Sequence, residues 1–147
     1  MFIEIFLIII QTIAVLITFI SVILIYKTIK SNERLNQQIL FSNITKEERE
    51  LKIKLNEYQE RFNNKRTTKK EKEIILLNRE SLLFNYYEYL AICLYKKLIN
   101  ESETKLYFED ILKGIKRDFD SSLLFEKKEA SKEEYPGIQW LFKKWNL

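Results

Sequence analysis

The sequence predicts an all-α protein, with one N-terminal transmembrane helix followed by a small cytosolic bundle of about four helices. Residues 5–26, IFLIIIQTIAVLITFISVILIY, form a run without charge, Pro or Gly. The chain of 147 residues contains only two Gly and one Pro, the residues that interrupt helices most often. C-terminal to this run, apolar residues recur at helical spacing. We therefore expect a transmembrane anchor (1–26), a basic juxtamembrane region (27–68) and a helical core domain (69–147).

The apolar run has the length of a membrane span. At ~1.5 Å per residue its helix is roughly 33 Å long, which matches the ~30 Å hydrocarbon core of a bilayer. Only Glu4 carries charge before the run, whereas Lys27, Lys30 and Arg34 follow it. The positive-inside rule then predicts a single-pass inner-membrane protein with its N-terminus outside and its C-terminal domain in the cytoplasm. A cleavable signal peptide fits less well, because no basic segment precedes the run and no small-residue cleavage site follows it.

Four small or polar residues lie on one side of the predicted span: Gln11, Ala14, Thr18 and Ser21. Small residues let membrane helices approach closely, so this stripe is a candidate face for homo-oligomerisation or partner binding. In the alternative, which we favour, the hydroxyls bond to their own helix and Gln11 reaches toward the outer interface.

The region behind the span is basic, with 12 basic and 6 acidic residues between positions 27 and 70. Ser42 and Asn43 are the first stop signal, and Thr45 with Glu48 has the spacing of a capping box. This predicts a new helix that begins near Lys46. Its apolar stripe either packs on the core domain, which we favour, or lies on lipid headgroups or a partner helix. The stripe consists of Leu51, Leu55, Tyr58 and Phe62.

Residues 63–70, NNKRTTKK, are predicted to form a basic turn. No aromatic residues are interleaved with these charges and no nucleic-acid motif is present, so we do not expect binding to nucleic acid. A solvated or lipid-facing turn is favoured. The candidate membrane-surface residues are Lys27, Lys30, Arg34, Lys65, Arg66, Lys69 and Lys70.

The next helix is predicted to run from about Lys69 to Leu98, because Thr68 and Glu71 form a second capping box. Its segment 82–95 is apolar or aromatic almost all round, which is typical of a central core helix. Buried polar groups on such a helix need hydrogen-bond partners. The candidates are Asn85, Tyr86 and Glu88, for which we expect Tyr hydroxyls or a neighbouring Lys or Arg as partners. A structural network is favoured over a ligand site.

Two further helices follow in the prediction. Asn100 and Glu103 mark the start of one, whose core face carries Phe108, Ile111, Leu112, Ile115 and Phe119. Residues 126–135 are predicted to be a charged loop. Pro136 suits the first position of a last helix. The residues of that helix expected to face the core of the domain are Ile138, Leu141, Phe142 and Trp145. Trp140 is expected to cover part of this core.

The C-terminal half resembles a known layout. The stretches FNYYEYLAICLYKKLINES and IQWLFKKWNL, with a helix between them, resemble bacterial and prophage proteins grouped as domain-of-unknown-function family 4760. Residues 85–88 and 140–143 match its two motifs over roughly residues 69–147, whereas Cys93 and Lys97 stand where small or Gly residues are expected. The resemblance implies an N-terminal membrane helix and a helical domain. It implies no particular activity.

Composition limits the chemistry. The chain has no His and a single Cys, which excludes Cys/His zinc sites and histidine catalysis. No phosphate-binding Gly loop or nucleophile motif is present, so we expect neither an enzyme nor a bound cofactor or metal. The sequence favours a membrane-anchored interaction protein with an unknown protein partner. The alternative is an oligomeric membrane effector or sensor in phage–host conflict, acting in superinfection exclusion, abortive infection or another antiphage defence.

Overall fold

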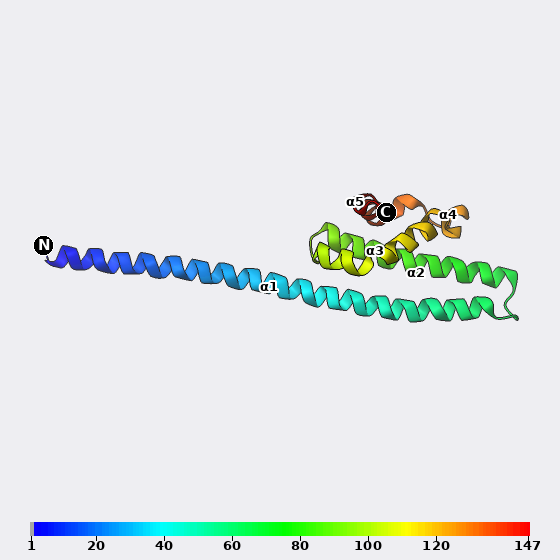
Figure 1. The fold of residues 1–147 in the computed structure, drawn as a ribbon, viewed down its shortest axis with the longest axis horizontal. Helices are drawn as coiled ribbons and strands as arrows, with labels where there is room; N and C mark the ends of the chain where they lie inside the picture. Colours follow the sequence, from blue (N-terminus) through cyan, green and yellow to red (C-terminus); the bar gives the residue numbers. More distant parts are fainter. Residues whose placement is uncertain (1) are drawn as a thin grey trace. The chain divides into compact units, whose positions relative to one another are not determined.

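The computed structural model describes the backbone of residues 2–147 and the side chains of residues 10–147. All regular structure in the described residues is helical, which confirms the all-α prediction (Figure 1). The chain forms two compact units, one reaching to Gln37 and one from Gln38 to Leu147. The elements are α1 (Phe2–Asn63), α2 (Lys69–Tyr95), α3 (Glu101–Asp120), α4 (Leu123–Glu126), the 3₁₀ turn η1 (Lys132–Glu134) and α5 (Pro136–Trp145).

The first unit consists of the N-terminal part of α1. From Ile10 onward this helix contains an 18-residue window with a mean hydropathy of 2.2, and none of that window is buried against the rest of the chain. By length and composition the helix can cross a membrane. The side chains of residues 5–9 in the predicted span lie outside the described residues.

The prediction of a new helix near Lys46 is wrong, because α1 continues without a break to Asn63. Thr45 does not cap a helix start. Its hydroxyl donates to the carbonyl of Ser42 at 2.9 Å, inside the continuous helix. Glu48, the other half of the expected box, is 1% exposed and belongs to the face that packs on the second unit. The polar pair at 42–43 is exposed, so it is tolerated without ending the helix.

The apolar stripe of α1 packs on the core of the second unit, as favoured by the sequence. Ile44 and Leu51 belong to the buried core, and Leu55 packs against it from the edge. Tyr58 and Phe62 are half-buried. The contact residues 41, 44, 48, 51, 55, 58 and 62 follow alternating steps of three and four, so one face of this helix meets the bundle.

The helix α2 lies at the centre of the second unit, between α1 and the C-terminal elements (Figure 1). Its buried residues are Ile75, Leu83, Phe84, Tyr87, Leu90, Ala91, Cys93 and Leu94. The prediction that this helix is covered on every side is wrong. The exposed fractions of Tyr89, Ile92 and Tyr95 are 43%, 39% and 66%. One side of the C-terminal part of α2 is therefore open.

Local signals set most helix ends correctly. The Thr68 and Glu71 capping box is present, with the Thr68 N–H donating to Glu71 at 2.8 Å. Asn100 accepts from the Glu103 N–H at 3.1 Å, and α5 begins at Pro136. The end of α2 differs from the prediction. It stops at Tyr95, and Lys97 then adopts a left-handed φ of 57°, which allows Leu98 N–H to donate to the carbonyl of Cys93 at 2.9 Å.

The predicted charged loop after α3 contains more structure than expected. The helix α4 precedes it, and η1 lies inside it. Phe125 stacks on Phe84 at 5.6 Å, and Tyr135 meets Phe119 edge to face at 6.0 Å. These aromatic contacts hold the segment on the core despite its exposed charges. The predicted core faces of α3 and α5 are confirmed by burial of Phe108, Leu112, Ile115, Phe119, Ile138, Leu141, Phe142 and Trp145, with Ile111 and Trp140 half-buried.

Candidate interaction site

Glu88 joins α2 to the start of α5. Its two carboxylate oxygens accept the N–H groups of Gly137 and Ile138, each at 2.8 Å. Tyr135, the residue before the first residue of α5, makes no side-chain cap, so the first turn of α5 depends on the distant carboxylate of Glu88. The partial positive charge of a helix N-terminus favours such an anion. Our expectation that a Tyr hydroxyl or a basic side chain would satisfy Glu88 is therefore wrong.

The small size of Gly137 is required at this junction. A Cβ atom added there would lie 2.7 Å from Glu88 Oε1 and 3.0 Å from Glu88 Cδ. Any larger residue would push the carboxylate away from the two N–H groups that it accepts. The dipeptide Pro136-Gly137 thus starts the helix and leaves room for its cap.

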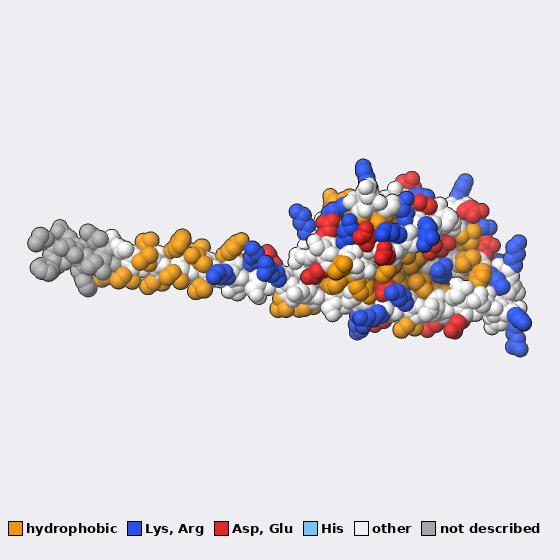
Figure 2. All heavy atoms as spheres, in the orientation of Figure 1, with side chains coloured by type: hydrophobic (Ala, Val, Ile, Leu, Met, Phe, Trp, Pro, Cys, Tyr) orange, Lys and Arg blue, Asp and Glu red, His pale blue; other side chains and the backbone are white. Residues whose placement is uncertain are grey.

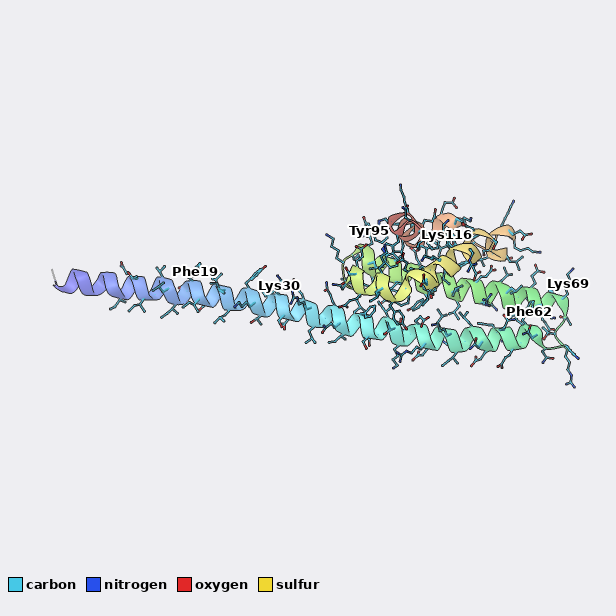
Figure 3. The ribbon with its side chains drawn as sticks, in the orientation of Figure 1. Phe19, Lys30, Phe62, Lys69, Tyr95 and Lys116 are labelled. Carbon is cyan, nitrogen blue, oxygen red and sulfur yellow. The ribbon has the colours of Figure 1, made fainter. Side chains whose placement is uncertain are left out.

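An apolar groove of about 250 Å³ lies beside this junction. Tyr95 and Trp140 meet edge to face at its rim, with ring centroids 5.3 Å apart. The Lys144 ammonium lies 4.9 Å from the centre of the Trp140 ring, so a cation borders an otherwise apolar surface. Tyr95, which Figure 3 labels, is 66% exposed. The groove is lined by Glu88, Ile92, Tyr95, Pro136, Gly137 and Trp140.

The structure does not bring Asn85, Tyr86 and Glu88 together as one polar network. Asn85 is exposed, and its amide NH₂ donates to Ser81 Oγ at 3.5 Å within α2. The Tyr86 hydroxyl instead donates to the carbonyl of Ile44 in α1 at 2.8 Å. Burial raises the pKa of Tyr86, so this donor keeps its proton at neutral pH. Glu88 borders the groove beside α5.

Glu48 is a buried carboxylate that the sequence analysis placed at a helix start. Among the residues that the structure describes, none makes a hydrogen bond of good geometry to either of its oxygens, although Lys52 Nζ lies 2.6 Å from Oε1. The charge of Glu48 contributes to the raised pKa of Tyr86 and of Tyr87 after the larger effect of burial. Its position in the 3–4 pattern of apolar contacts is the signal that could have revealed its burial.

Glu80 is a second carboxylate that caps a distant helix, and the sequence analysis missed it. It accepts the Ser122 hydroxyl at 2.6 Å and the Leu124 N–H at 2.8 Å, at the start of α4. No local spacing relates positions 80 and 122, so no sequence signal pointed to this contact. Two glutamates of α2 therefore hold the starts of α4 and α5.

The predicted oligomerisation stripe lies on the exposed first unit. The hydroxyls of Thr18 and Ser21 donate to the carbonyls of Ala14 and Ile17, at 2.9 and 2.8 Å. The small side chains leave a shallow hollow along this face, which includes Ala14 and Thr18. Assembly through the stripe stays a prediction.

The predicted membrane-surface residues are all exposed and fall into two sets. Lys27, Lys30 and Arg34 belong to the first unit, whereas the others lie at the tip of the hairpin formed by α1 and α2. Figure 2 shows blue side chains at this tip. Their contact with lipid stays a prediction. The tip set consists of Lys65, Arg66, Lys69 and Lys70.

The described residues contain no group of three or more Cys, Asp or Glu side chains that could hold a metal ion. Comparison with known protein families, with curated proteins and with solved structures finds no match for this chain. The function must therefore be argued from the physical features of the two units.

Proposed function

We propose that this chain is a single-pass membrane protein whose N-terminal helix anchors a helical interaction domain in the cytoplasm. The apolar N-terminal part of α1 carries the proposal. Its 18-residue window has a mean hydropathy of 2.2 and is wholly unburied, whereas a core helix of a soluble protein would bury such a surface. Lys27, Lys30 and Arg34 support the cytoplasmic orientation of the domain.

The groove between α2 and α5 is the proposed interaction surface of that domain. Tyr95 is 66% exposed and contacts the ring of the half-buried Trp140, and such aromatic residues often contribute most to binding energy in interfaces. Lys143 and Lys144 lie on the same helix as Trp140, and Lys144 covers its ring. A protein segment with an apolar side chain next to a carboxylate would complement this surface in shape and charge.

Membrane extraction tests the anchor. We expect the full chain to stay in the membrane fraction at alkaline pH and a protease added outside the cell to leave the C-terminal domain intact. Intact mass should correspond to the uncleaved chain. Release of the domain by alkali, or a mass that lacks the first segment, would contradict the anchor.

Site-specific photo-crosslinking in cells tests the interaction surface. A photo-crosslinking residue in place of Trp140 should give a discrete adduct. The same residue in place of Leu106, which is 90% exposed and outside the groove, provides the matched control. Equal adducts from both positions would count against the groove.

A second candidate function is an oligomeric membrane effector or sensor in phage–host conflict. The hollow along Ala14 and Thr18 favours close approach of a second helix. Gln11→Leu combined with Thr18→Leu should then abolish cross-linked oligomers. The double variant Ile13→Leu and Ile20→Leu, on the opposite side of the helix, should leave them unchanged. Unaltered oligomers in the first variant would exclude this assembly face.

A further inference from the structure

A second cleft, of about 300 Å³, lies at the tip of the hairpin where α1 ends and α2 begins. It is distinct from the groove beside α5 and contains no residue of that groove. Phe62 and Lys69 mark this end of the second unit in Figure 3. The cleft is lined by Tyr58, Arg61, Asn64, Arg66, Thr67, Glu71, Ile74, Ile75 and Asn78.

The turn between the helices fixes the two arginines at the cleft. Thr67 donates its hydroxyl to the carbonyl of Arg61 at 2.8 Å, and its N–H to the carbonyl of Asn64 at 3.1 Å. The N–H of Arg66 donates to Asn64 Oδ1 at 3.0 Å. The side-chain NH₂ group of Asn64 is a hydrogen-bond donor, whereas its oxygen accepts the Arg66 N–H. The backbone that carries the arginines is thus held by side-chain bonds as well as by the helices.

The lining is rich in donors and contains only one carboxylate. The guanidinium groups of Arg61 and Arg66 form no ion pair within the part of the chain that the structure describes. The carboxylate of Glu71 already accepts the N–H and the hydroxyl of Thr68, both at 2.8 Å. These two bonds, together with the charge of Arg61, lower the pKa of Glu71. The cleft therefore offers unmatched positive charge to a ligand.

Charge around the cleft is predominantly positive. Residues 61–72 contain six basic side chains and one acidic side chain. Lys65 and Lys70 lie on this tip but do not line the cleft. Such a field attracts anions before contact, and paired arginines recognise phosphate oxygens through planar, two-point hydrogen bonds.

We propose that this cleft binds a phosphate-bearing ligand, with the guanidinium groups of Arg61 and Arg66 on its oxygens. Asn64 and Asn78 contribute amide donors beside them, and Tyr58 with Ile74 forms an apolar wall for the organic part. The shared chemistry is a phosphate of at least two negative charges, carried either by a soluble small molecule or by a lipid headgroup. The site does not depend on the groove or on the proposed anchor.

Isothermal titration calorimetry of the full chain in an uncharged detergent tests the site. Inorganic pyrophosphate is the soluble probe, and detergent micelles that contain phosphatidylcholine with or without phosphatidylinositol 4-phosphate are the lipid probe in the same calorimeter. We expect Arg61→Gln with Arg66→Gln to weaken binding by about tenfold or more. The matched control, Lys65→Gln with Lys70→Gln, removes the same charge and should weaken binding only about twofold.

A second pair of variants guards against misfolding of the turn. Asn78→Asp places a carboxylate in the cleft and should weaken binding, whereas Asn56→Asp on the exposed side of α1 should not. Equal losses for cleft and control variants, or absence of saturable binding to both probes, would overturn the proposal. Preference for pyrophosphate would identify a soluble ligand, and binding to the phosphoinositide micelles alone would identify a headgroup.

Discussion

On the two sides of α2, two glutamates are satisfied in different ways: Glu88 of α2 is half-buried beside α5, whereas Glu48 of α1 is buried in the contact of α1 with the bundle. Toward α5, Glu88 accepts two helix N–H groups at 2.8 Å. Toward α1, Glu48 is 1% exposed and pairs with the Lys52 ammonium, 2.6 Å from its Oε1, and among the described residues no hydrogen bond of good geometry reaches it. The difference lies in what the facing element offers. A helix N-terminus presents fixed donors, whereas the side of a helix presents none of its backbone N–H groups.

The two contacts are therefore stabilised by different interactions. The junction with α5 is closed by charge-assisted hydrogen bonds that depend on a single geometry. The contact with α1 combines good apolar packing at Ile44 and Leu51 with one costly charge between them. We therefore expect α1 to separate from the bundle before α5 does.

The largest expected effect is the loss of the α5 cap. Glu88→Ala leaves the N–H groups of Gly137 and Ile138 without their acceptor, and should lower the free energy of unfolding by about 3 kcal/mol. Urea unfolding of the full chain in uncharged detergent measures the change. Glu88→Gln, which keeps one acceptor oxygen, should lose less. A loss below about 1 kcal/mol for the alanine variant would break the comparison.

The next effect has the opposite sign. Glu48→Leu removes a buried charge and leaves its partner, the 57% exposed Lys52 side chain, in solvent, so it should raise the free energy of unfolding by about 2 kcal/mol. The same urea titration measures it, with the exposed Glu47→Leu as the control that should change stability by less than about 0.5 kcal/mol. Destabilisation by Glu48→Leu would show that the pair with Lys52 contributes more than its burial costs.

A third substitution tests whether Gly137 stabilises the fold through the hydrogen bonds of Glu88. Gly137→Ala should displace the carboxylate and cost about 1–2 kcal/mol, because its Cβ would lie 2.7 Å from Oε1. In a Glu88→Ala background the same change should cost much less. A double-mutant cycle measures this coupling, and full additivity would mean that Gly137 acts independently of Glu88.

The smallest effect concerns an exposed carboxylate. Glu101 accepts Lys144 Nζ at 2.6 Å and Trp145 Nε1 at 3.2 Å, which lowers its pKa below the ordinary value of 4.5 chiefly through the Lys144 bond. A lowered folded-state pKa contributes stability above pH 4.5, and this contribution is lost as the pH falls through the folded value. The gain should stay below about 1 kcal/mol because the pair is exposed to solvent.

Melting temperatures of the native chain and of Glu101→Gln test this pH dependence. The difference between them should be largest near neutral pH and should shrink below pH 4.5. Lys113→Gln, which breaks an exposed ion pair within α3, controls for loss of surface charge. A difference that grows on acidification would contradict the sign of the Glu101 contribution.

Local sequence determined the helix starts of the second unit. Thr68 with Glu71, Asn100 with Glu103, and Pro136 each act within one helical turn, so their spacing was sufficient. Apolar periodicity likewise identified the core faces of α3 and α5. The same local reasoning failed at Thr45 and Glu48, because a capping box can form only where the preceding backbone leaves the helix.

Only the tertiary structure decided which polar groups meet. Glu80 and Glu88 cap helices 42 to 50 residues away, at distances that no local pattern encodes. Asn85 and Tyr86 have different hydrogen-bond partners because the side chains of adjacent helix positions point in directions about 100° apart. The sequence alone determined that an unburied apolar helix precedes a helical bundle, since composition and periodicity are sufficient for that. The caps, the buried Glu48 and the cleft between Arg61 and Arg66 depend on how those helices pack.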